Sequence, residues 1–210
     1  MSHFFMKGFF MAAKFDFGTE LSNGFNLFKE NMGLLILASF LASLIGLLTC
    51  TVLMGPLSVG VLLIIARLLK KDDPVPQVGD IFKGFDFFLN SFLLCLIFMV
   101  CSTVAFIPII GKLISMTLGT LFWWGLMFIA FENLTAIEAI KKVINETASG
   151  NFFNQLLFAL VANLIAGAGI LLCGVGALFT VPLSYCMMVC CYQATYGNKS
   201  SLPDPNVFLK

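Results

Sequence analysis

The stretch GLLILASFLASLIGLLTCTVL, residues 33–53, decides the fold class, because its 21 residues include no Asp, Glu, Lys, Arg or His. At a helical rise of about 1.5 Å per residue it reaches about 31 Å, which matches the hydrocarbon core of a bilayer. Backbone polar groups in lipid must be satisfied within the segment, and the stretch lacks the alternation of a barrel strand. It therefore predicts a transmembrane helix.

Similar apolar runs fill most of the chain, and one of them is short. The runs cover residues 33–53, 54–69, 90–107, 113–131, 153–173 and 176–196. In the short run, 54–69, Pro56 suits the first turn of a helix and Arg67 can extend to the lipid headgroups. Hydrophobic residues make up 60% of the chain and charged residues 11%, against about 25% charged in soluble domains. This composition excludes a water-soluble enzyme, a disordered chain and a nucleic-acid binder, and predicts an all-α, polytopic transmembrane helical bundle.

The links between the runs group them in pairs. The links around Gly55-Pro56, around Pro108 and at 174–176 are short, whereas those at 70–89 and 132–152 are longer and polar. We therefore expect six spans arranged as three helical hairpins in a single integral membrane domain. Residues 1–17 form an N-terminal segment, residues 18–196 the three hairpin repeats, and residues 197–210 a loose cytoplasmic tail with no periodicity.

A weak internal repeat supports the three hairpins. A short amphipathic stretch precedes each pair and ends in Asn31, Asn90 or Asn151, which are 59 and 61 residues apart. Thr135 and Glu138 form a capping-box pattern at the start of the third stretch. Two interpretations remain open: the stretches are short helices lying in the headgroup plane, or they extend the spanning helices by a turn or two.

The basic residues predict the orientation. Six spans put both termini on one face, and that face carries eleven of the twelve Lys and Arg residues, with Lys112 alone on the other. The positive-inside bias makes the crowded face cytoplasmic, in a cell inner membrane. The acids lie on the same face, so we expect selective recognition there. Tyr192 and Tyr196 have the position of aromatic belt residues, whereas Trp123 and Trp124 fall in mid-span, so that at least one should pack between helices.

Catalytic chemistry is not indicated by the spans. They contain no deep acid, base or histidine, and His3 is the only histidine of the chain. This pattern argues against proton relays, intramembrane zinc proteolysis and Ser-His nucleophiles. Cys186, Cys190 and Cys191 resemble a soft-metal cluster, but Cys191 lies about 100° further round the helix. We expect no enzyme activity, no metal and no cofactor.

The candidate residues are therefore structural. Asn163 is expected to form an interhelical hydrogen bond rather than a substrate contact, and Gly167 and Gly169 to allow close helix approach, which would make the fifth span the centre of the bundle. Pro56 and Pro108 mark turns. Glu132 is expected to form a structural ion pair with Arg67 or Lys141.

Several short motifs resemble a known family. They are LFKENMGLLIL, GPLSVG at 55–60, DIFKGF at 80–85, FENLTAIEAIKK at 131–142 and GNFFN at 150–154. Together, over residues 20–196, they resemble the six-span inner-membrane proteins related to YciC, and are similar to the membrane domain fused to some bacterial glycerophosphodiester phosphodiesterases. The resemblance implies a multi-pass cell-membrane protein and carries no activity, because the phosphodiesterase chemistry belongs to a separate soluble domain. One departure is Pro108-Ile-Ile-Gly111, where relatives often have Pro-Gly, which places the turn geometry in doubt.

Two classes of function remain. The first is a membrane scaffold or envelope-integrity module, whose partners would be membrane lipids and a membrane protein or a second copy of the chain, with no nucleic acid. The alternative is a transporter or channel for an apolar or lipid-like solute. The three hairpins share one orientation, which disfavours alternating access by inverted repeats.

Overall fold

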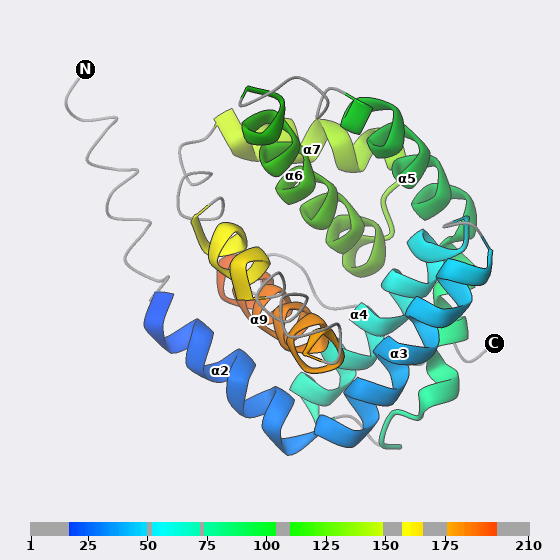
Figure 1. Cartoon of the computed structure of the whole chain (residues 1–210), viewed down its shortest axis with the longest axis vertical. Coiled ribbons are helices and arrows are strands. Elements are labelled where there is room, and N and C mark those ends of the chain that lie inside the picture. The colour runs from blue at the N-terminus through cyan, green and yellow to red at the C-terminus, as the bar shows by residue number, and fades with distance from the viewer. Residues whose placement is uncertain are drawn as a thin grey trace.

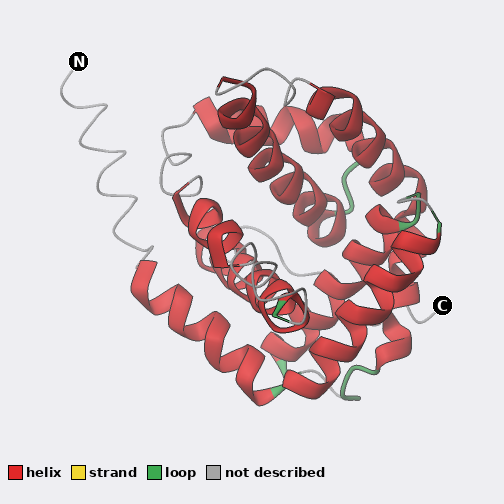
Figure 2. Cartoon of the chain, viewed as in Figure 1, coloured by secondary structure: helices red, strands yellow, loops and turns green. Residues whose placement is uncertain are grey.

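A computed structural model describes residues 17–49, 52–71, 74–103, 110–148, 157–165 and 176–196. Eight labelled helical elements lie in these ranges, and the described part of the chain contains no strand (Figures 1 and 2). The elements are α2 (Phe17–Glu30), α3 (Met32–Leu48), α4 (Met54–Lys70), η2 (Val78–Phe87), α5 (Phe88–Ser102), α6 (Ile110–Glu132), α7 (Ala136–Ala148) and α9 (Ala177–Tyr196). Residues 157–165 are also helical. The all-α prediction is confirmed.

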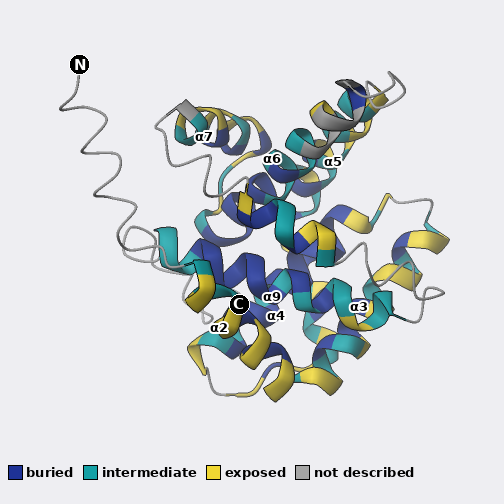
Figure 3. Cartoon of the chain, turned by 60° about the vertical axis from the view of Figure 1, so that its left-hand side comes forward, coloured by how far each residue is buried: buried dark blue, intermediate teal, exposed yellow. Residues whose placement is uncertain are grey.

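Two helices, α4 and α9, form the centre of the bundle (Figure 3). Twelve of the 17 residues of α4 are buried, and the second half of α9 is buried almost throughout. The ambiguous run at 54–69 is thus the most enclosed helix, and Pro56 lies in its first turn as predicted. In the fifth run, Ala159 and Ala162 face the core and Asn163 is exposed; the expectation that this span is central stays a prediction, because residues 166–173 lie outside the described part.

Glycine contacts join α4 to η2 at backbone distance. A Cβ added at Gly60 would lie 1.9 Å from Ile81 O, and one added at Gly84 would lie 1.9 Å from Pro56 O. Small residues let helix backbones approach closely, which explains why the motifs GPLSVG and DIFKGF pack against each other. The 3₁₀ form of η2 adds a capping box between Gln77 and Asp80 at its start.

The same arrangement recurs between α2 and α9. A Cβ at Gly24 would lie 2.7 Å from Met187 Cα. Gly24-Phe25-Asn26 in α2 matches Gly84-Phe85-Asp86 in η2, and Pro182-Leu183-Ser184 in α9 matches Pro56-Leu57-Ser58 in α4. Each amphipathic element therefore packs on a long helix: η2 on α4, α7 on α6, and α2 on α9 at the far end of the chain.

The amphipathic stretches divide between the two interpretations. α2 meets α3 at a bend of 90°, and α6 meets α7 at 119°, so α2 and α7 are separate helices. η2 instead continues into α5, and the two together form one helical stretch, Val78–Ser102. The predicted capping box is confirmed, because Thr135 N donates to Glu138 Oε2 at 3.0 Å and Glu138 N to Thr135 Oγ1 at 3.4 Å. The Asn90 side chain accepts a hydrogen bond from the N–H of Ala136, the first residue of α7.

Within the described ranges, two helices are long and apolar enough to cross a membrane, Val78–Ser102 and Ala177–Tyr196, and each bent pair adds one if it counts as a single span. Two to four candidate spans are thus present rather than the six expected. α3 and α4 have 17 residues each, and only 157–165 of the fifth run lies in the described part. The described part of the chain therefore has helices long and apolar enough to cross a membrane, while membrane insertion and the six-span count remain predictions.

Candidate functional site

The C-terminal part of α9 contacts the end of α6 through Tyr192 and shares a cavity with the end of α4. Tyr192 of α9 donates a hydrogen bond from its OH to Glu132 Oε1 at the end of α6, over 2.9 Å. The last turns of α4 and α9 line a common cavity with α2. The three amphipathic elements pack around the same helices. We call these helix ends and the elements packed on them the charged end, because Arg67 at the end of α4 and Glu132 at the end of α6 each form an ion pair.

The first ion cluster joins α4 to η2 and the loop before it. Arg67 Nη1 contacts Asp80 Oδ2 at 2.9 Å, and Arg67 Nη2 donates to Pro74 O at 2.9 Å. Lys83 Nζ lies 3.0 Å from Asp80 Oδ1, and the N–H of Gln77 donates to Asp80 Oδ2. A planar guanidinium that bonds two acceptors fixes the loop as well as the helix. Arg67 therefore stabilises the connection between α4 and η2.

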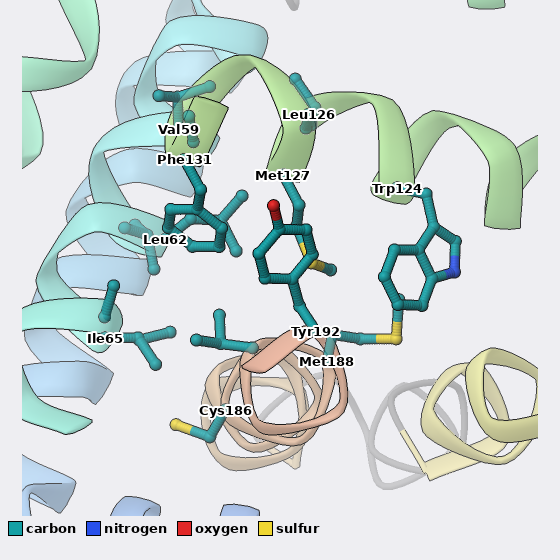
Figure 4. Close-up of a cluster of buried hydrophobic side chains, with 14 of the residues drawn as sticks. Val59, Leu62, Ile65, Trp124, Leu126, Met127, Phe131, Cys186, Met188 and Tyr192 are labelled. Atoms are coloured by element: carbon teal, nitrogen blue, oxygen red, sulfur yellow. The ribbon is translucent and has the colours of Figure 1, made fainter. Parts of the chain in front are cut away.

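The second cluster joins α6, α7 and α9. The Lys142 ammonium contacts Glu132 Oε2 and lies 4.7 Å from the centroid of the Phe128 ring. The Tyr192 ring is fully buried, with its centroid 4.9 Å from that of Phe131 and 6.0 Å from that of Trp124 (Figure 4). Glu132 thus bonds to both α7 and α9.

A polar cavity of about 520 Å³ lies between α2 and the ends of α4 and α9. Its charged lining residues are Glu20, Glu30, Lys70 and Lys71, so that the formal charges balance. The other lining residues are Asn23, Asn26, Leu27, Leu68, Leu69, Cys190, Gln193 and Ala194. Gln193 Oε1 is buried and receives no hydrogen bond from the described residues. This cavity has the size and polar lining to hold a small ligand.

Arg67 and Glu132, which were singled out from the sequence, both form ion pairs, but with partners other than those expected. Arg67 and Glu132 are each in an ion pair, but the expected pair with Arg67 or Lys141 is wrong: Glu132 binds Lys142, and Arg67 binds Asp80. Lys142 rather than Lys141 faces Glu132, because Lys141 is exposed on α7.

The expectation for Asn163 also needs correction, because its side chain is exposed rather than placed between the described helices. One residue corresponds to about 100° on a helix, so the buried Ala162 and Asn163 face different directions. Gly167, Gly169 and Pro108 lie outside the described residues, as do segment 1–16 and tail 197–210.

The aromatic predictions are divided. Trp124 is 2% exposed and packs between helices, as expected for at least one mid-span tryptophan. Tyr192 and Tyr196, expected in an interfacial belt, are instead buried at 0% and 4% exposure. Their rings face α6, because the end of α9 crosses Trp124 and Phe128.

Sequence reasoning missed the partners Asp80, Lys142 and Gln193. A usable signal was present for Asp80, because Gln77 and Asp80 have capping-box spacing. Lys142 and Gln193 carried no comparable signal, since their roles depend on which helices meet. Cys186, Cys190 and Cys191 are buried in α9, and in the described ranges no three His, Cys, Asp or Glu residues are grouped as metal ligands would be.

Comparison with protein-family models, with curated proteins and with solved structures found no match to this chain.

Proposed function

We propose that the chain is a multi-pass inner-membrane scaffold module that presents a rigid charged end to the cytosol, with both termini on that side. The observation that supports this proposal is that α4 and α6 each end in an ion pair to the amphipathic element that follows, Arg67–Asp80 and Glu132–Lys142, while Tyr192 of α9 donates a hydrogen bond to Glu132. Each ion pair joins two consecutive elements, and the Tyr192–Glu132 hydrogen bond joins α9 to α6, so that these contacts hold one arrangement of the surface. A fixed polar surface above lipid-facing helices is what a docking platform requires.

Exposed apolar side chains support membrane insertion. Leu47 and Leu48 of α3 are 74% and 75% exposed, and Leu89 at the start of α5 is 72% exposed. On α7, Ala139 and Val143 face the protein, whereas Ile137 and Ile144 are exposed. Large apolar surfaces of this kind need lipid or a partner to cover them. α7 fits a helix that lies at the headgroup level, with its isoleucines in lipid.

Cysteine labelling tests the orientation. Single cysteines replace Lys141, Asp86 and Lys112 in a background without natural cysteines, and an impermeant maleimide is applied to intact cells and to inverted vesicles. We expect positions 141 and 86 to react only in inverted vesicles and position 112 only from outside. Labelling of position 141 in intact cells refutes the proposed orientation.

A second measurement separates scaffolding from transport. Photocrosslinkers at exposed positions of α7 should capture a stoichiometric membrane partner or a second copy of the chain, while proteoliposomes show no saturable flux of amphiphiles. Saturable flux without a partner contradicts the scaffold proposal.

One observation favours the alternative, a transporter for a lipid-like solute. An apolar groove of about 280 Å³ lies between α3 and α9, lined in part by Leu44, Leu47 and Val181. The groove accepts an acyl chain by its chemistry. The flux experiment decides between the two functions.

A further inference from the structure

We propose that the polar cavity at the charged end binds the head group of a zwitterionic aminophospholipid, a primary ammonium joined to a phosphate. This inference rests on the proposed membrane orientation and names the lipid that the scaffold recognises. The volume of the cavity, about 520 Å³, falls in the range of small-molecule sites.

Part of the cavity lining favours a cation. Glu20 and Glu30 of α2 contribute carboxylates to the lining. The last turns of α4 and α9 also face it, and the carbonyl ends of helices carry partial negative charge. Gln193 Oε1 is a buried acceptor that receives no hydrogen bond from the described residues, which costs free energy until a donor binds. A primary ammonium is positively charged and supplies three N–H donors, so it suits both the carboxylates and Gln193 Oε1.

Lys70 and Lys71 favour an anion in the same ligand. They line the cavity at the end of α4, where Lys71 adopts a left-handed backbone conformation with φ of 56°. This αL cap ends the helix, so that Lys70 and Lys71 belong to its last turn and its cap. Lysine is a common phosphate ligand. Two carboxylates and two ammonium groups suit a zwitterion better than a purely anionic or purely cationic ligand.

The position of the cavity favours a lipid as the source. Leu27, Leu68 and Leu69 contribute apolar surface to its lining, and Phe25 of the adjacent α2 is 51% exposed. An acyl-glycerol unit attached to the phosphate extends over such a surface. A soluble phosphoethanolamine shares the polar chemistry and lacks this contact.

The test uses the full chain in nanodiscs with equal parts of phosphatidylethanolamine, phosphatidylcholine and phosphatidylglycerol. Native mass spectrometry after transfer to detergent measures which lipid is retained. We expect phosphatidylethanolamine to be retained at least five-fold over phosphatidylcholine, because trimethylation removes the N–H donors. Phosphatidylglycerol should also be retained less, because it has no ammonium.

Variants locate the site. Glu30→Gln, Lys71→Gln and Gln193→Leu should each reduce the preference to less than two-fold. The matched controls, Asp86→Asn and Lys141→Gln, change the same kinds of charge at exposed positions outside the cavity and should retain it. Size-exclusion profiles confirm that each variant is folded, and Gln193→Glu replaces Gln193→Leu if the leucine variant fails this check.

The outcomes separate the sources. Retention of phosphatidylethanolamine that the cavity variants abolish supports the lipid site. Displacement of an ammonium-bearing fluorescent probe by soluble phosphoethanolamine, with no lipid preference, supports the site and assigns it a soluble ligand. Equal retention of the three lipids with no soluble binding overturns the inference, as does an unchanged preference in all the cavity variants. The labelling of positions 86, 112 and 141 is independent of these results, so that a failed ligand site and a failed orientation can be distinguished.

Discussion

Replacing Gly84 by alanine tests the backbone contact between α4 and η2. The new Cβ would lie 1.9 Å from Pro56 O and 2.5 Å from Gly60 N, both of them backbone atoms that no rotamer change can move. Carbon–oxygen contacts lie at about 3.3 Å or more, so η2 must move away from α4 by about 1.4 Å. A gap of that size removes much of the dispersion energy across the contact.

Overpacking of this kind costs about 1–3 kcal/mol, and the upper end applies because both partners are backbone. The higher helix propensity of alanine offsets at most about 1 kcal/mol of this loss in the free energy of unfolding. We therefore expect a net loss of about 2–3 kcal/mol, which corresponds to a Tm lower by roughly 5–10 °C for a chain of this size.

The assay is thermal unfolding of the detergent-solubilised protein, followed by tryptophan fluorescence. The matched control is Gly33→Ala, because a Cβ at Gly33 meets nothing within 4 Å. That variant should melt at or slightly above the wild-type temperature. If Gly84→Ala and Gly33→Ala melt together, the helices are not in backbone contact and the reasoning about α4 and η2 is refuted.

Three further predictions concern polar contacts. Glu132→Gln should lower the free energy of unfolding by about 1.5–3 kcal/mol, because a carboxylate with two partners is lost. A double-mutant cycle with Tyr192→Phe should show a coupling energy of at least about 0.5 kcal/mol. If the effects of the two single variants are strictly additive, the hydrogen bond between Tyr192 and Glu132 is excluded. Arg67→Lys should lower Tm and increase proteolysis of the 71–77 loop, because an ammonium cannot reproduce the two-acceptor contact; a wild-type cleavage rate would contradict that role. Hydrogen bonds from the Thr135 backbone and hydroxyl lower the pKa of Glu138 below its ordinary value of 4.5, so this contact stabilises the fold above that pH and is lost as the pH falls through the folded-state pKa. Thr135→Ala should thus lower Tm at pH 7, and the difference from wild type should narrow below pH 4.5; a pH-independent difference would mean that the carboxylate is not involved.

Helix positions were predictable from sequence because the signals are local. Apolar runs and the Thr135–Glu138 spacing placed most elements within a few residues, for example 176–196 against Ala177–Tyr196. The predicted and observed helix ends differ more where an amphipathic stretch continues into an apolar run, as where η2 continues into α5.

Packing was much less predictable, because lipid-facing and protein-facing apolar surfaces have the same composition. Nothing in the run 54–69 distinguishes a central helix from a peripheral one until Gly60 meets Gly84. The ion-pair partners were assigned incorrectly for the same reason: Glu132 has several cations within reach in sequence, and the 119° bend after α6 selects Lys142. The polar cavity arises from three helices that are distant in the chain, so no local pattern indicates it.

The contact between α2 and α9 has a consequence for biosynthesis. Met187 is synthesised about 160 residues after Gly24, which at roughly 5–20 residues per second is a delay of about 8–30 s. During that interval α9, the partner of α2, has not yet been synthesised. The headgroup layer or a chaperone must therefore cover the apolar face of α2. Synthesis of α9, rather than the emergence of any early hairpin, then completes this contact.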